Sequence, residues 1–130
     1  MAAVYDYRDL IVWQKSVDLA VLVHETVKCL PKEELFCLSS QIRRAAISIP
    51  SNIAEGHQRG SARDYLHFIY IAKGSLAELE TQILLCERLG YINDDKLQPI
   101  NSLCSEIGKM LNTLRNKLQE SISGNPKNRI

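Results

Sequence analysis

The chain has 130 residues, of which 45% are hydrophobic and 24% are charged, and its formal net charge at pH 7 is +1. This length is sufficient for one domain with its own hydrophobic core, and the near-neutral charge argues against binding of polyanions through bulk charge alone. The sequence contains no apolar run long enough to cross a membrane and no signal-peptide pattern, so we expect a cytoplasmic protein.

The first predicted element is a helix over about residues 9–30, which Pro31 ends because proline cannot supply a helical N–H. Its apolar residues form two stripes: Leu10, Trp13, Val17, Ala20, His24 and Val27 in the first, and Val12, Leu19, Val23 and Leu30 in the second. Two stripes give a wider apolar surface than the core of a single bundle requires.

The second predicted helix covers about residues 32–57 and contains Pro50, so we expect a kink or a break over residues 47–51. Beside its apolar stripe, polar side chains recur every three or four residues and therefore share one helical face. This polar ladder comprises Arg44, Ser48, Asn52, Glu55 and Arg59. Such a ladder either forms a network inside the protein or faces a partner.

The third predicted helix covers residues 62–89, with Ser61 as N-cap and Gly90 as its stop, and the fourth begins at residues 93–95 and reaches Ile122. Because the connections are short, consecutive helices must run antiparallel. The sequence therefore predicts an all-α, up-down-up-down four-helix bundle over residues 1–123, followed by a disordered tail over 124–130.

No constellation of residues in the sequence indicates catalysis, a metal or another cofactor. None of the glutamates is followed by a histidine three residues later, as a carboxylate-bridged metal pair in a bundle would require. The sequence also contains no Gly-x-Ser-x-Gly and no P-loop. The four cysteines, Cys29, Cys37, Cys86 and Cys104, lack metal-site spacing, and we interpret them as reduced core residues. We predict a protein that is not an enzyme.

The polar ladder has a structural and a functional interpretation. In the structural one, Arg43 or Arg44 pairs with Glu78 or Glu80 of the third helix, and small residues on both helices allow close approach. In the functional one, two basic clusters contact nucleic-acid phosphates, consistent with the net positive charge of residues 41–73 and 108–130. These clusters are Arg59, Arg63 and Lys73, and Lys109, Arg115 and Lys117.

The segment from Gln41 to Gly56 resembles the four helix bundle protein family, also known as the large-subunit ribosomal RNA intervening-sequence proteins. The matching motif reads Gln-x-x-Arg-Ala-x-x-Ser-Ile-x-x-Asn-Ile-Ala-Glu-Gly, and the resemblance extends over roughly residues 5–120. It implies a bundle that assembles into a ring, typically a homopentamer. In such a ring, the second stripe of the first helix would be buried between subunits. A related branch, the accessory proteins of diversity-generating retroelements, binds nucleic acid but is strongly basic, unlike this chain.

We therefore expect a cytoplasmic homo-oligomer, with a pentamer favoured, that associates with RNA, DNA or the ribosome through backbone charge. The alternative is an assembly scaffold that binds another protein and has no nucleic-acid role. The residues assigned to the structural or interface ladder are Gln41, Arg44, Ser48, Asn52, Glu55, Gly56 and Glu78. The residues assigned to nucleic-acid contact are Arg59, Arg63, Lys73, Lys109, Arg115 and Lys117.

Overall fold

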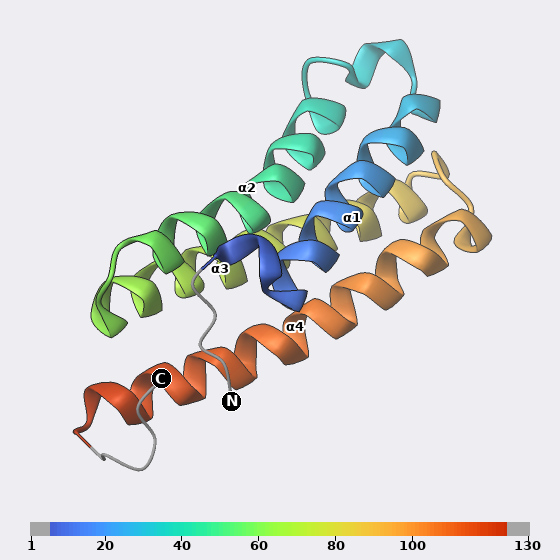
Figure 1. The fold of residues 1–130 in the computed structure, drawn as a ribbon. Helices are drawn as coiled ribbons and strands as arrows, with labels where there is room; N and C mark the ends of the chain where they lie inside the picture. Colours follow the sequence, from blue (N-terminus) through green and yellow to red (C-terminus); the bar gives the residue numbers. More distant parts are fainter. Residues whose placement is uncertain (1–5, 125–130) are drawn as a thin grey trace.

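The computed structural model describes residues 6–124, which form four long helices in an antiparallel bundle (Figure 1). The helices are α1 (Ile11–Thr26), α2 (Leu38–Gln58), α3 (Ala62–Arg88) and α4 (Asp94–Ile122). Each helix packs against its two neighbours in the cycle α1–α2–α3–α4, and the closest packing joins α2 to α3. The four-helix bundle predicted from the sequence is confirmed. Of the predicted tail, only Gly124 lies within the described residues.

Three short 3-10 helices modify the first half of the predicted pattern. They are η1 (Tyr7–Asp9), η2 (Val27–Cys29) and η3 (Lys32–Glu34). The first predicted helix is therefore divided into η1, α1 and η2, and α2 begins at Leu38 rather than at Lys32.

Local signals in the sequence determine where α3 and α4 begin. The Ser61 hydroxyl accepts a hydrogen bond from the backbone N–H of Asp64, and the Asn93 side chain accepts one from Lys96. Each bond satisfies one of the backbone N–H groups that a helix leaves free at its N-terminus. Gly90, which follows α3, has a φ of +74°, a conformation that glycine adopts without steric cost.

Helix α2 runs through Pro50 without a break, so of the kink or break predicted for this segment the break is wrong. The proline removes one helical hydrogen bond, but its ring is buried and Ile49 and Ile53 on either side are fully buried as well. Packing of this apolar surface holds the helix together across the missing bond.

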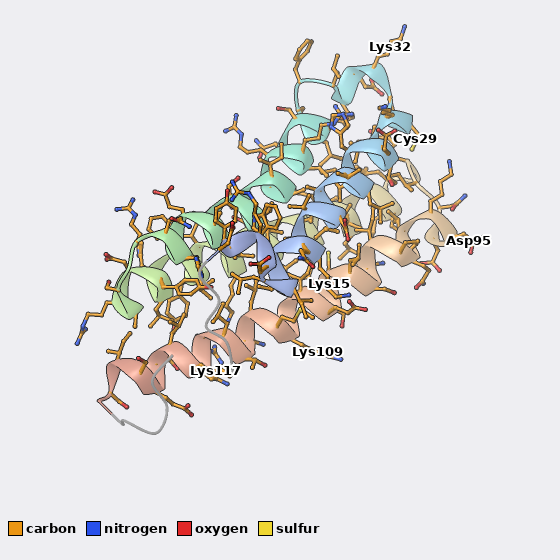
Figure 2. The ribbon with its side chains drawn as sticks, viewed as in Figure 1. Lys15, Cys29, Lys32, Asp95, Lys109 and Lys117 are labelled. Carbon is orange, nitrogen blue, oxygen red and sulfur yellow. The ribbon has the colours of Figure 1, made fainter. Side chains whose placement is uncertain are left out.

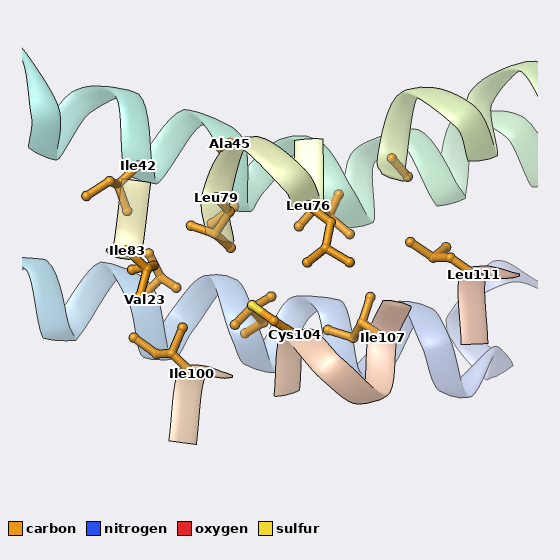
Figure 3. Packing of buried hydrophobic residues seen from close by; sticks show 14 of the residues in the cluster. Val23, Ile42, Ala45, Leu76, Leu79, Ile83, Ile100, Cys104, Ile107 and Leu111 are labelled. Carbon is orange, nitrogen blue, oxygen red and sulfur yellow. The ribbon is translucent and has the colours of Figure 1, made fainter. Parts of the chain in front are cut away.

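The core contains apolar side chains from all four helices, including Val23, Ile42, Leu79 and Ile107 (Figure 3). It also contains the second stripe of the first predicted helix, namely Val12, Leu19, Val23 and Leu30. The prediction that this stripe lies between subunits is therefore wrong. The protein uses it for its own core, and residues of the first stripe such as Val17 and Ala20 remain only half-buried.

The cysteines divide into two pairs by burial. Cys86 and Cys104 are buried in the core, whereas Cys29 and Cys37 are exposed, so the interpretation of all four as core residues is wrong for two of them. Burial raises the pKa of Cys86 to about 11 and that of Cys104 to about 12. Both buried thiols are therefore neutral at physiological pH.

Candidate nucleic-acid interface

The middle of the polar ladder forms a hydrogen-bond network between α2 and α3. The side-chain Nδ2 of Asn52 donates to the carbonyl oxygen of Ser48 at 2.8 Å and to its Oγ at 2.9 Å. The Ser48 Oγ in turn lies 2.8 Å from the Oγ of Ser75 on α3. These half-buried polar groups bond to one another: Ser48 joins α2 to Ser75 on α3, and Asn52 supports Ser48 from within α2.

Gly56 closes the same contact between α2 and α3. A Cβ placed on it would lie 2.7 Å from the Cβ of Phe68 and 3.0 Å from the ring of Tyr65. Only a glycine allows this approach, because neither neighbouring atom lies at the far end of a flexible side chain. We call the contact formed by Ser48, Asn52, Gly56 and Ser75 the α2–α3 seam.

The ends of the ladder are exposed and make no bond to the third helix. Within residues 6–124, no ion pair joins Arg43 or Arg44 to Glu78 or Glu80, so the predicted network between these charges is wrong. Glu78 and Glu80 are exposed on α3, and Gln41 and Arg44 are exposed on α2.

The first predicted basic cluster is divided between different sides of α3. Arg59 lies on the α2 side, where it forms an ion pair with Glu55 at 2.7 Å and covers the ring of Phe68 at 4.9 Å. Arg63 is exposed near the start of α3. Lys73 lies on the α4 side, with its Nζ 5.9 Å from the ring centroid of Tyr70. The charge of Arg59 is already compensated, whereas that of Lys73 is not.

The second predicted basic cluster is also divided. Arg115 and Lys117 are two residues apart on α4 and therefore point to nearly opposite sides of the helix. Arg115 is half-buried beside α3, and Lys117 and Lys109 are exposed on other sides of α4 (Figure 2). The exposed lysines are spread along the helix and do not converge on one point.

The structure instead brings together one cation from each predicted cluster. The Nε2 of Gln119 on α4 donates to the hydroxyl of Tyr70 on α3 at 2.7 Å. Lys73 lies one turn from Tyr70 on α3, and Arg115 lies one turn from Gln119 on α4. Because the two helices are antiparallel, this contact places Lys73 beside Arg115. Partial desolvation, followed by the positive charge of Arg115, lowers the pKa of the Lys73 ammonium. We call Tyr70, Lys73, Arg115 and Gln119 the α3–α4 cluster.

The positive charge of the α3–α4 cluster is not neutralised within the described part of the chain. Neither Lys73 nor Arg115 forms an ion pair there, and the guanidinium of Arg115 donates only to the side-chain oxygen of Asn116, at 3.0 and 3.2 Å. Two neighbouring cations without a carboxylate suit a phosphate group. Tyr70 and Gln119 were not predicted as site residues, although they lie three residues from Lys73 and four residues from Arg115 in the sequence.

A second surface feature is an apolar groove between α1 and α2. It contains a hollow of about 300 Å³ lined by Val17, Ala20, Val21, Ile47 and Pro50, with Arg43 at its edge. A second hollow of about 680 Å³ continues toward Leu35 and Phe36. Phe36 is 92% exposed, and Val21 and Ile47 are 60% and 56% exposed. This α1–α2 groove is an apolar surface that the fold leaves uncovered.

The described residues contain neither a group of potential metal ligands nor a membrane-spanning helix. Across residues 6–124, no three His, Cys, Asp or Glu side chains gather as a metal site requires. No helix in this same range is both long and apolar enough to cross a membrane.

The fold and these surfaces define a class of protein: an all-α four-helix bundle with a compact polar seam and a small cationic cluster. Residues 8–113 match the family of 23S rRNA-intervening sequence proteins, and the chain belongs to this family. Among solved structures, it is similar to a protein of unknown function from the S23 ribosomal protein family of Bacteroides thetaiotaomicron. The two are 30% identical, with a TM-score of 0.73, over 81% of this chain and 98% of that one. No curated protein matches the chain.

Proposed function

We propose that this protein is a non-enzymatic accessory protein that binds nucleic acid through phosphate contacts at the α3–α4 cluster. The observation that carries the proposal is the pair of cations, Lys73 and Arg115, which lie one turn from the Tyr70–Gln119 bond on facing helices and form no ion pair within residues 6–124. Membership in a family named for sequences that interrupt 23S rRNA makes RNA the first ligand to test. Arg63, Lys109 and Lys117 add weaker, separate contacts for a long polyanion.

This mode of binding does not read base sequence. Lysine and arginine neutralise phosphates, release counterions and position the ligand, whereas sequence is read by contacts to base edges. The net charge of +1 predicts modest affinity that falls steeply as salt concentration rises.

The experiment is the binding of a fluorescent RNA hairpin to the full chain, measured by anisotropy between about 50 and 200 mM salt. We expect Lys73→Gln combined with Arg115→Gln to weaken binding and to reduce the salt slope by about 1, because the two cations share one phosphate. The control carries Arg88→Gln and Lys96→Gln, which remove the same charge from exposed positions elsewhere.

Absence of RNA binding by the wild type at about 50 mM salt would contradict the proposed function. An equal loss in the control pair would show that net charge, rather than the α3–α4 cluster, determines binding.

We also propose that the chain assembles with copies of itself through the α1–α2 groove. The observation that favours assembly is the exposed apolar surface of Val21, Ile47 and Phe36 beside a hollow of about 300 Å³. An exposed apolar patch with a concave centre is typical of a protein interface. A ring of five copies, as the family resemblance implies, requires such a surface on every copy.

Light scattering on the wild type and on Ile47→Glu tests assembly. We expect a wild-type mass several times the 14.7 kDa of one chain, and a large shift toward that value in Ile47→Glu. Leu84→Glu is the control, because Leu84 is also exposed, at 48%, but lies on α3. A wild-type mass of one chain would contradict self-assembly and leave the groove as a site for a different protein, as the scaffold alternative requires.

A further inference from the structure

Tyr70 stands apart from the other large apolar side chains on the bundle surface because its ring is held in place. It is 46% exposed, Gln119 donates a 2.7 Å hydrogen bond to its hydroxyl, and the Nζ of Lys73 lies over its ring at 5.9 Å. These two contacts restrict the rotation of the Tyr70 side chain before any ligand binds. Binding on this ring therefore costs less conformational entropy than binding on a mobile side chain.

A fixed aromatic ring next to two cations has the composition of a site for unpaired nucleotides. Bases stack on aromatic side chains in proteins that bind single strands, while neighbouring lysine or arginine residues hold the backbone. A base inside a duplex has both of its faces covered by its neighbours and is unavailable for such stacking. The cluster is therefore more complete for a single strand than for a double helix.

We propose that the α3–α4 cluster binds an unpaired segment of a polynucleotide, with one base stacked on Tyr70 and the adjacent phosphate between Lys73 and Arg115. This inference rests on the proposed function and specifies its ligand. Gln119 is a positioning residue, since it contacts the Tyr70 hydroxyl and holds the ring. None of the four side chains is assigned to the 2′-hydroxyl, so RNA and DNA strands should bind alike.

The test compares four labelled probes of about 12 nucleotides. They have one sequence and are prepared as single strands and as duplexes, in RNA and in DNA. Anisotropy is measured at about 0.1 M salt with wild type, Tyr70→Ala, Tyr70→Phe and Ile71→Ala. Ile71 is the matched control, because it is the next residue on α3, is 38% exposed and lies outside the cluster.

We expect the wild type to prefer single strands, and Tyr70→Ala to lower single-strand affinity by about tenfold while leaving duplex affinity unchanged. Tyr70→Phe should retain most of the affinity, because it keeps the ring and loses only the bond to Gln119. Ile71→Ala should bind like wild type. Thermal unfolding of each variant verifies that the bundle remains folded.

The outcomes separate this inference from the proposed function. If wild type binds single strands and duplexes equally and Tyr70→Ala changes neither, the stacking site is wrong, while phosphate binding by the cluster stands. If no probe binds, both are wrong. A preference for single-stranded RNA over single-stranded DNA would contradict the expectation that the two strands bind alike, because it would require a contact to the 2′-hydroxyl outside these four side chains.

Discussion

The two flanks of α3 are built from different chemistry. On the flank that faces α2, Ser48, Asn52 and Ser75 satisfy one another, and Gly56 brings the backbones close together. On the flank that faces α4, Lys73 and Arg115 form no ion pair within the described part of the chain, and Tyr70 remains 46% exposed. The first flank joins two helices of the bundle, and the second is the one for which we propose ligand binding.

This contrast changes how the Gln41–Gly56 motif is interpreted. Its serine, asparagine and glycine lie in the α2–α3 seam, where they determine how closely two helices pack. The residues best placed to bind a ligand, Tyr70 and Arg115, lie outside the motif. A sequence signature of this kind can therefore report on packing, while the proposed binding surface lies on two other helices, α3 and α4.

The largest expected effect compares Gly56 of α2 with Gly108 of α4, the glycines that face the two flanks of α3. Gly56→Ala should lower the free energy of unfolding by about 2 kcal/mol, because its Cβ would lie 2.7 Å from that of Phe68. Gly108→Ala, on the α4 side, would meet only a Leu76 methyl at 3.5 Å and should raise stability by about 0.5–1 kcal/mol. Urea denaturation measures both. Equal effects would remove the distinction between the flanks.

The next effect concerns the core on the α4 side and appears at alkaline pH. Burial raises the pKa of Cys104 from 9.0 to about 12, so the unfolded chain loses this proton first. At pH 10, stability should therefore be lower than at neutral pH by about 1.4 kcal/mol from this thiol. Cys104→Ala should show a shallower decline, and Cys37→Ala, which removes an exposed thiol, should follow the wild type. Parallel curves for all three proteins would refute the assignment.

A smaller effect compares one side-chain hydrogen bond on each flank. Asn52→Ala should lower the free energy of unfolding by about 1 kcal/mol, because it removes both half-buried bonds to Ser48. Gln119→Ala removes an exposed bond to Tyr70 and should change stability by less than about 0.5 kcal/mol. Thermal unfolding of the two variants provides the comparison, and a larger loss in Gln119→Ala would reverse it.

The smallest effect compares one arginine on each flank. Arg59→Gln removes an ion pair with Glu55 and the contact with Phe68, and should lower stability by about 0.5–1 kcal/mol at low salt. Arg115→Gln removes a charge that lies beside Lys73 and should leave stability within about 0.5 kcal/mol of wild type. Denaturation at low and high salt separates them, because salt should reduce only the effect of Arg59→Gln.

The sequence predicted the bundle because the apolar spacing and short connections of a helical chain allow few arrangements. The same reasoning did not predict which face of the first helix is buried, because two of its faces have the same apolar spacing. Both stripes of the first helix satisfied a helical repeat, and only packing against the other helices showed that Leu19 and Val23 belong to the core. The basic clusters failed for a related reason, since residues near in sequence, such as Arg115 and Lys117, point away from each other.

The sequence alone determined the class of fold, the starts of α3 and α4 and the family, because these depend on local signals and on periodicity along one chain. The tertiary structure decided which polar residues satisfy one another, which glycine is sterically required and which two cations meet. These properties depend on how each helix is rotated against its neighbours. Packing of all four helices sets that rotation, and no segment of the sequence specifies it separately.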